Sequence, residues 1–294
     1  VFSETREHRF LPGVSFPDSL TFTGSPSEAF AAADLALVVV PSSTIEQNIG
    51  RVAPELRRVP LIVSAIKGIA PGSGHRATQR ISDSLDPTGQ IGAISGPNLA
   101  REIADSLPSS ATVAFADRVA ASAAQEALST PRFRVYSSDD VLGVELGGAL
   151  KNVIAIGAGI IDGLRIGDNG KAAFISRGLA EITRLGVAMG ARPETFAGLS
   201  GMGDLVATCY SGLSRNRHVG ELLASGKSTD QILSEMGQVA EGVHTTQAVI
   251  ELAESHGVDM PIAQLTGRVL YEGVSPAEAL EMLMNRAPAP ETRR

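Results

Sequence analysis

The stretch VELGGALKNVIAIGAGII, residues 144–161, is the most apolar part of this 294-residue chain and divides it into two patterns. It carries Glu145, Lys151, Asn152 and four glycines, so it predicts a helix buried inside a folded protein rather than a membrane span. Before about residue 140, strand and helix patterns alternate, and after it only helical patterns follow. We therefore expect an α/β domain over residues 1–140 and an all-α domain over residues 141–294.

The strand patterns of the first half are nearly continuous apolar runs, typical of a parallel sheet covered on both faces. They are LALVVV (35–40), PLIVSAI (60–66), QIGAIS (90–95), ATVAF (111–115) and RFRVY (132–136). The last two are more polar or more closely spaced, which favours an antiparallel edge. Ahead of the first run, Glu4 to Arg9 predicts an isolated helical turn.

The composition excludes several classes of protein. With 25 Lys and Arg against 32 Asp and Glu, the net charge of −7 gives no basic surplus for nucleic acid. The single cysteine, Cys209, excludes an internal disulfide and indicates a reducing compartment. The five histidines lack metal-ligand spacing. We expect a cytoplasmic protein with no metal site, no nucleic-acid partner and no stable membrane insertion.

Lysine is rare in this chain, and two of the four lysines lie in apolar surroundings. Lys67 ends the strand PLIVSAI, and Lys151 lies in the apolar stretch. An amine can be desolvated until it acts as a base near neutral pH, whereas a guanidinium stays charged. The alternatives are that Lys151 reaches out to solvent and that Lys67 merely ends its strand. The small residues flanking Lys151 (Gly147, Gly148) predict room for a ligand on that helix.

Polar residues follow three of the predicted strands. They are Ser42, Lys67 and the turn Ser95-Gly96-Pro97. Because ligands of open parallel sheets bind beyond the carboxyl ends of the strands, we expect a small-molecule site at this edge, between the two domains.

Three groups of polar residues in the helical half could complete such a site. Asp204 in GMGDL (201–205) could orient Lys151 or a substrate hydroxyl, or it could cap a helix. SRNR (214–217) offers hydroxyl, guanidinium and amide donors suited to a phosphate, or it could be a solvated turn. Glu241 could accept hydrogen bonds from ribose hydroxyls, or it could cap the next helix. The glycine-rich segments of this half follow no strand, so none of them is a dinucleotide fingerprint.

Longer segments resemble one known family. They are ISGPNLARE (94–102), GALKNVIAIGAGIIDGLRIGDN (148–169), GLSGMGDL (198–205), SRNR (214–217) and GQVAEG (237–242). Over essentially its whole length the chain is similar to NAD(P)-dependent glycerol-3-phosphate dehydrogenases. The resemblance implies a Rossmann-like domain followed by a helical one. It also implies a homodimer that uses NAD or NADP to interconvert sn-glycerol 3-phosphate and dihydroxyacetone phosphate for glycerophospholipid synthesis.

The resemblance also implies residue roles. Lys151 would accept the proton of the substrate hydroxyl. The other substrate contacts would be Lys67, Gly96, Asn98, Asp204, Ser214, Arg215 and Asn216. The cofactor contacts would be Lys67, Ala100, Arg215, Val239 and Glu241.

The chain departs from the family pattern at two places. Asn98 stands where the family usually has Ser or Thr. The strand, GxGxxG turn, helix and second strand with which the family begins have no counterpart here, so we expect an N-terminally incomplete Rossmann-like domain, and the sequence does not distinguish NAD from NADP. Two alternatives stay open: a non-catalytic remnant that keeps a phosphate pocket, and another two-domain hydroxyacid dehydrogenase.

Overall fold

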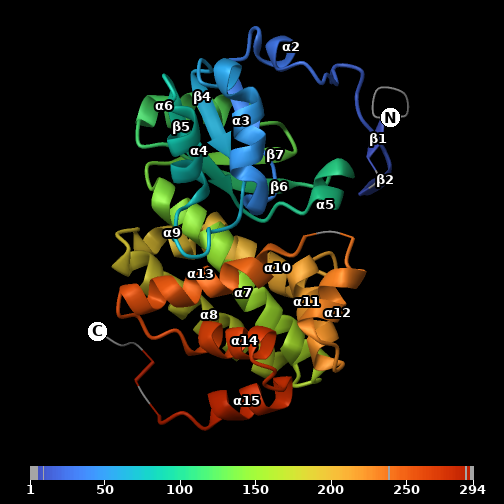
Figure 1. Ribbon diagram of the computed structural model, residues 1–294, viewed down its shortest axis with the longest axis vertical. Helices are drawn as coiled ribbons and strands as arrows, with labels where there is room; N and C mark the ends of the chain where they lie inside the picture. Colours follow the sequence, from blue (N-terminus) through green and yellow to red (C-terminus); the bar gives the residue numbers. More distant parts are fainter. Residues whose placement is uncertain (1–5, 9, 238, 289, 292–294) are drawn as a thin grey trace.

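The computed structural model describes residues 6–8, 10–237, 239–288 and 290–291. It has an α/β part and a helical part, stacked along the long axis of the molecule (Figure 1). The α/β part ends with a strand at Ser138, and the first helix of the helical part begins at Val141. The expected order, a Rossmann-like α/β domain followed by an all-α domain, is confirmed.

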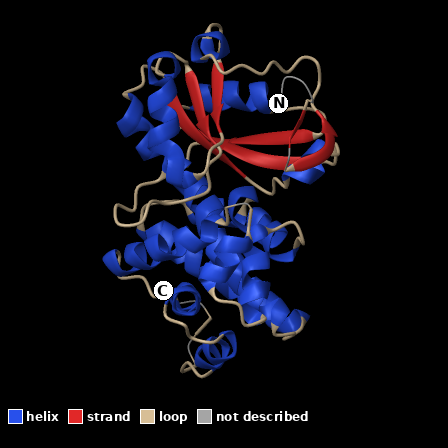
Figure 2. Cartoon of the chain, turned by 45° about the vertical axis from the view of Figure 1, so that its right-hand side comes forward, coloured by secondary structure: helices blue, strands red, loops and turns tan. Residues whose placement is uncertain are grey.

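The α/β part is built on a five-stranded sheet in the order β3-β4-β5-β6-β7 (Figure 2). Its strands are β3 (Leu35–Val38), β4 (Leu61–Ser64), β5 (Gln90–Ser95), β6 (Ser109–Ala114) and β7 (Phe133–Ser138). Its helices are α2 (Pro26–Phe30), the 3₁₀ turn η1 (Ser42–Thr44), α3 (Ile45–Leu56), α4 (Ala77–Leu85), α5 (Ala100–Ala104) and α6 (Arg118–Leu128).

The strand directions follow from the connections. Helices α3 and α4 carry the chain back across the sheet, so β3, β4 and β5 run parallel. The antiparallel pair is β5–β6, inside the sheet, whereas β7 at the edge is parallel to β6 because α6 connects them. The sheet therefore has an antiparallel pairing, as predicted, but it lies inside the sheet and not at the edge.

The segment before the sheet is a short hairpin. Strand β1 (Glu7–His8) pairs antiparallel with β2 (Leu11–Ser15), so the helical turn predicted over Glu4 to Arg9 is wrong at Glu7–His8. Glu4, Thr5 and Arg9 lie outside the described residues. The guanidinium of Arg6 donates hydrogen bonds to the carbonyls of Phe16 and Leu20, at 3.1 and 3.0 Å. Such contacts between distant residues override a short local pattern.

The helical part surrounds one long helix, α7 (Val141–Gly163). The other elements are α8 (Asp168–Ala188), α9 (Pro193–Ala197), the π-helical turn η2 (Leu199–Gly203), α10 (Asp204–Tyr210), α11 (Arg215–Ala224), α12 (Thr229–Glu235), α13 (Glu241–Ser255), α14 (Pro261–Tyr271) and α15 (Pro276–Met284). By length and composition α7 could cross a membrane, but its apolar window is 100% buried inside the protein. It is therefore the core helix of this part.

Two glycines bring α11 directly onto α7. A Cβ atom on Gly159 would overlap the carbonyl of Arg217, and one on Gly220 would overlap the carbonyl of Ile156. The two backbones therefore touch where other residues would keep them apart. This contact holds the SRNR segment, at the start of α11, against the helix that carries Lys151.

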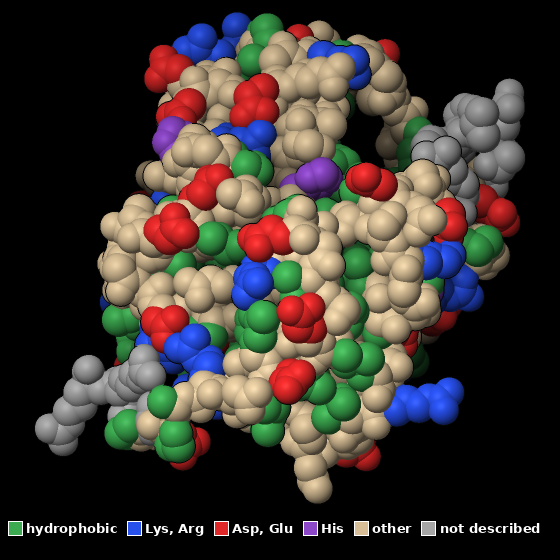
Figure 3. Space-filling view, turned by 60° about the horizontal axis from the view of Figure 1, so that its bottom comes forward, with side chains coloured by type: hydrophobic (Ala, Val, Ile, Leu, Met, Phe, Trp, Pro, Cys, Tyr) green, Lys and Arg blue, Asp and Glu red, His purple; other side chains and the backbone are tan. Residues whose placement is uncertain are grey.

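The surface of the helical part mixes charges of both signs. On the face shown in Figure 3, Asp and Glu side chains are interspersed with Lys and Arg. No broad basic area covers that face, in keeping with the net charge of −7.

Candidate active site

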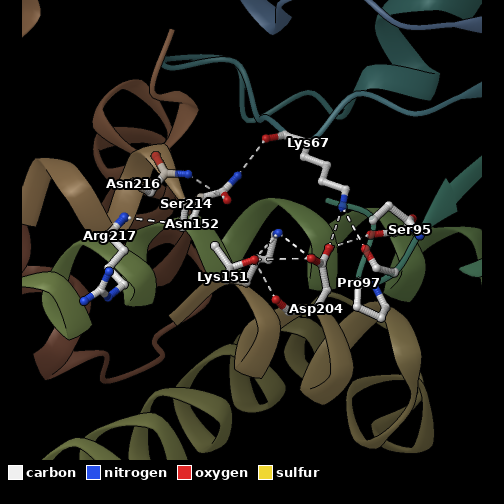
Figure 4. Close-up of polar contacts among 12 residues, drawn as sticks. Lys67, Ser95, Pro97, Lys151, Asn152, Asp204, Ser214, Asn216 and Arg217 are labelled. Carbon is white, nitrogen blue, oxygen red and sulfur yellow. Dashed lines mark hydrogen bonds and ion pairs between the residues drawn. The ribbon is translucent and has the colours of Figure 1, made fainter. Parts of the chain in front are cut away.

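The centre of the site is a carboxylate held between two amines (Figure 4). The Nζ atom of Lys67 lies 2.6 Å from Oδ2 of Asp204, and the Nζ atom of Lys151 lies 2.5 Å from Oδ1. The side chains of Lys151 and Asp204 are only 7% and 3% exposed, whereas that of Lys67 is 23% exposed. These residues come from the loop that follows β4, from α7 and from the start of α10, so the group joins the two parts of the molecule.

The surroundings of Lys151 bring its pKa close to neutrality. Burial and the positive charge of Lys67 lower it from 10.5 to about 8, against the raising effect of Asp204. Lys151 also donates a hydrogen bond to Oγ1 of Thr208 at 2.6 Å, and that hydroxyl donates in turn to the backbone carbonyl of Asp204 at 2.6 Å. A buried lysine with this pKa can exchange a proton at ordinary pH. The alternative of a solvent-facing Lys151 is therefore wrong.

Asp204 stays ionised in this site. Burial raises its pKa, but the charges of Lys67 and Lys151 outweigh that effect, and the net pKa lies below the ordinary value. Its side chain does not cap α10, because it is the first residue of that helix and bonds to the two lysines instead. The helix-cap alternative for Asp204 is therefore wrong.

The glycines beside Lys151 serve packing. A Cβ atom on Gly147 would lie 2.6 Å from the carbonyl oxygen of Ser200, and one on Gly148 would overlap Oγ of Ser95. The prediction that these glycines leave room for a ligand on α7 was wrong, since η2 and the end of β5 fill that space. The glycines allow the close approach that lets Asp204 reach Lys151.

The turn after β5 closes the site from the α/β side. The Gly96 carbonyl accepts a hydrogen bond from Nζ of Lys67 at 3.0 Å, and Oγ of Ser95 lies 3.3 Å from Oδ2 of Asp204. Gly96 has φ of +156°, and a Cβ atom there would lie 2.7 Å from the Ser110 carbonyl oxygen. Asn98 turns to β6, since its amide donates to the carbonyl of Ser110 at 3.1 Å.

The SRNR segment begins α11 and places its four side chains differently. Ser214 caps the helix, accepting from the Arg217 N–H at 3.2 Å, so this is no solvated turn. Asn216 is buried and donates to Oδ1 of Asn152 at 2.9 Å. Arg217 faces away from Lys67, with its Nε 2.6 Å from Asp162. Arg215 is exposed and makes no hydrogen bond or ion pair within the described part of the chain.

Three further residues expected to contact the cofactor are Glu241, Val239 and Ala100. Glu241, at the start of α13, accepts from the backbone N–H of Ser42 at 2.9 Å and also from the Ser42 hydroxyl. This contact joins α13 to the carboxyl end of β3. The Glu241 side chain does not cap its own helix, so the helix-cap alternative is wrong. Val239 is 39% exposed, and Ala100 is exposed at the start of α5.

Two residues of the site were missed from the sequence. Asn152 donates to the backbone carbonyl of Lys67 at 3.2 Å and accepts from Asn216, so it ties the Lys67 backbone to α11. Thr208 orients Lys151, as described above. Thr208 lies four residues after Asp204, on the same face of α10, and Asn152 is next to Lys151; these spacings are the signals that could have found them.

Comparisons with known proteins show similarity over both parts of the chain. The family models of the NAD-dependent glycerol-3-phosphate dehydrogenase N-terminus and C-terminus match residues 1–121 and 140–281. The glycerol-3-phosphate dehydrogenase [NAD(P)+] of Streptomyces griseus is 47% identical over 97% of this chain and 85% of its own length. That of Thermobifida fusca is 47% identical over 96% of this chain and 84% of its own length.

Solved structures show the same likeness. A glycerol-3-phosphate dehydrogenase from Coxiella burnetii superposes with a TM-score of 0.88 and 37% identity, over 94% of this chain and 84% of that one. The structure named DsGPDH from Dunaliella salina gives a TM-score of 0.85 and 29% identity, over 95% of this chain and 50% of that one. This chain belongs to the NAD-dependent glycerol-3-phosphate dehydrogenase family.

Proposed function

We propose that this protein is an NAD(P)-dependent oxidoreductase that interconverts sn-glycerol 3-phosphate and dihydroxyacetone phosphate, supplying glycerophospholipid synthesis. The observation that carries the proposal is the buried Lys151, with a pKa of about 8, hydrogen-bonded to Asp204 at the junction of the two parts. Oxidation of a secondary alcohol needs a base for the hydroxyl proton, and a base is most effective when its pKa lies near the working pH.

The hydrogen bonds around Lys151 leave one position for the substrate. A neutral amine has two N–H groups and one lone pair. The two N–H groups are directed to Asp204 and Thr208, which fixes the amine and leaves its lone pair for the substrate hydroxyl. In the reduction direction the same amine, now protonated, returns the proton to the oxygen that forms the alcohol.

The SRNR segment supplies the phosphate contact. Arg215 is a permanently charged and unpaired guanidinium within the described part of the chain, and such a group suits a dianionic phosphate. Ser214 and Asn216 are buried beside it at the first turn of α11, where free N–H groups also favour an anion. Lys67 and Gly96 would contact the three-carbon body of the substrate. Asn98 would contribute least, because its amide is bonded to β6.

The residues around the site fit a dinucleotide. The parallel strands β3, β4 and β5 end at the helical part, where dinucleotides bind in such sheets, and Glu241, Ser42 and Arg215 offer carboxylate, hydroxyl and guanidinium groups there. Lys67, Ala100, Arg215, Val239 and Glu241 would hold the cofactor. NAD or NADP supplies, when bound, the hydride exchange at C2 of the substrate.

We propose that the chain divides into residues 1–140 and 141–294, with substrate and cofactor bound between them. The single buried cysteine and the buried α7 support a cytoplasmic location without membrane insertion. The family resemblance supports a homodimer.

A direct assay tests the activity. The purified chain is mixed with glycerol 3-phosphate and either NAD or NADP, and the absorbance of the reduced nicotinamide is followed. We expect turnover with the phosphorylated substrate and little with unphosphorylated 2-hydroxy acids. Binding of glycerol 3-phosphate without turnover would favour the non-catalytic remnant. Preference for unphosphorylated hydroxy acids would favour the other class of dehydrogenase.

A further inference from the structure

One face of α7 makes a row of contacts with the α/β part. Glu145, Gly148 and Asn152 follow each other at spacings of three and four residues, so they lie on the same face. A Cβ atom on Gly148 would lie 3.5 Å from Cγ of Lys67, and Asn152 bonds to the Lys67 carbonyl at 3.2 Å. Lys67 is therefore held directly by the middle and the end of this row.

Glu145, at the start of the row, binds the beginning of α4. Its Oε1 accepts from the backbone N–H of Thr78 at 2.8 Å, and its Oε2 accepts from the Thr78 hydroxyl at 2.6 Å. It also forms an ion pair with Arg76. The carboxylate is buried, and every one of these partners belongs to the segment that follows Lys67 in sequence. A buried carboxylate with several donors holds its partners in one arrangement.

The segment between Lys67 and Thr78 is a closed loop. Ile69 and Arg76 form an isolated antiparallel bridge, and the Ala70 N–H donates to the His75 carbonyl at 3.1 Å. The two ends of the loop are thus held side by side. Asn152 holds the end at Lys67, and Glu145 holds the end at Arg76 and Thr78. These two anchors lie on the helix that carries Lys151, and the middle of the loop has a third anchor on α13, because the Gly72 N–H donates to Oε2 of Glu251 at 2.8 Å.

We propose that Glu145 is a positioning residue that sets the place of Lys67 relative to Lys151 and Asp204. It never touches the reacting atoms; it acts through the closed loop, which moves as one piece with Lys67. The inference rests on the proposed function for its kinetic consequences, but the position of Lys67 is testable without any substrate.

Three variants test the proposal. Glu145→Ala removes both the acceptor and the charge, and Glu145→Gln keeps one acceptor oxygen for the Thr78 N–H. The control is Glu181→Gln, because Glu181 is also buried and also accepts from backbone N–H groups, those of Ile262 and Ala263 at the start of α14. All three changes lower thermal stability. Only the Glu145 variants displace Lys67.

The first readout is the titration of Lys151 itself. The chain has four lysines, so the NMR signals of isotope-labelled side-chain amines can be resolved, with Lys151→Ala giving the assignment. The charged groups that act on Lys151 are Lys67, which lowers its pKa, and Asp204, which raises it; burial raises the pKa of the nearby Cys209 thiol to about 12, so that thiol stays neutral. Withdrawal of Lys67 removes a cation that lowers the Lys151 pKa, so Glu145→Ala should raise that pKa by about half a pH unit or more. Glu181→Gln should leave it unchanged.

The second readout is kinetic. Glu145→Ala should lower kcat for glycerol 3-phosphate by about tenfold, because small displacements of catalytic groups cost that much or more, and Glu145→Gln should restore part of the loss. An unchanged Lys151 titration in a folded Glu145→Ala protein would overturn the proposal, whatever its thermal stability. Absence of turnover in the unaltered chain would overturn the proposed function. The NMR titration would still test whether Glu145 sets the position of Lys67, because it needs no substrate.

Discussion

Besides Lys67, the proposed site contains two cationic centres of opposite character, Lys151 and Arg215. Lys151 is buried, hydrogen-bonded to Asp204 and Thr208, and has a pKa of about 8. Arg215 is exposed and forms no ion pair within the described residues. The difference fits the role that we propose for each group: a proton carrier must change charge at ordinary pH, whereas a phosphate anchor must keep its charge.

The two centres also differ in how many structural elements are needed to position them. The Lys151 site needs three elements to meet in one place, and the glycines at 147 and 148 allow this approach. The Arg215 site needs only the first turn of α11, which Ser214 caps. Loss of the first centre should therefore abolish the chemical step, and loss of the second should weaken substrate binding.

Removal of the amine should have the largest effect. Lys151→Ala is expected to lower kcat by about ten thousandfold, the upper range for a general base, while NAD(P) binding measured by fluorescence changes little. Lys171→Ala is the matched control, since Lys171 is also buried and paired with a carboxylate, that of Asp162. We expect the control to lose stability and keep most of its turnover. Turnover of Lys151→Ala near the original rate would remove Lys151 from the mechanism.

Neutralising the carboxylate should have the next largest effect. Asp204→Asn leaves two amines near each other without a counter-charge, and we expect kcat to fall about a hundredfold as Lys151 loses its orientation. Because Asp204 raises the pKa of Lys151, its loss should also move the pH dependence of oxidation to lower pH. Movement to higher pH would contradict the electrostatic account. Circular dichroism checks that the variant is folded.

Removal of the exposed guanidinium should act on binding. Arg215→Ala should raise the KM for glycerol 3-phosphate about tenfold or more, the range for a charge-assisted hydrogen bond, with a smaller change in kcat. The KM for unphosphorylated glycerol should change far less. Equal effects on the two substrates would remove the phosphate assignment.

The unaltered protein should show the charge change of Lys151 in its pH profile. Oxidation needs the neutral amine, so kcat/KM should rise about tenfold per pH unit below pH 8 and level off above it. Reduction needs the protonated amine, so its rate should fall as pH rises through the same value. Steady-state rates in both directions, from pH 6 to about pH 10, measure the two limbs. If the oxidation and the reduction rates both rose with pH, a single proton carrier shared by the two directions would be excluded.

Part of the fold and part of the candidate site could be predicted from the sequence. The alternating strand and helix patterns predicted both parts of the fold, because apolar periodicity is a local property. Lys67, Lys151 and Asp204 were identified as candidates, and the structure brings them together. The sequence did not predict that Ser95 and Ser200 fill the space beside the two glycines, since that depends on how η2 and β5 approach α7. Nor did it predict the pairing of Glu7–His8 with β2, which is also a contact between separate segments.

A change of salt concentration should have the smallest effect, and it should act on Arg215 but not on Lys151. Screening acts on exposed charges and much less on buried pairs, so it should reach Arg215 and spare Lys151 with Asp204. Raising the ionic strength from about 0.05 to about 0.3 M with a non-binding salt should raise the KM for glycerol 3-phosphate roughly two- to threefold and leave kcat nearly constant. Arg215→Ala should lose most of this salt dependence, because the screened attraction is then absent. A salt-sensitive kcat with a constant KM would reverse the assignment, placing the exposed charge in the chemical step and the buried pair in binding.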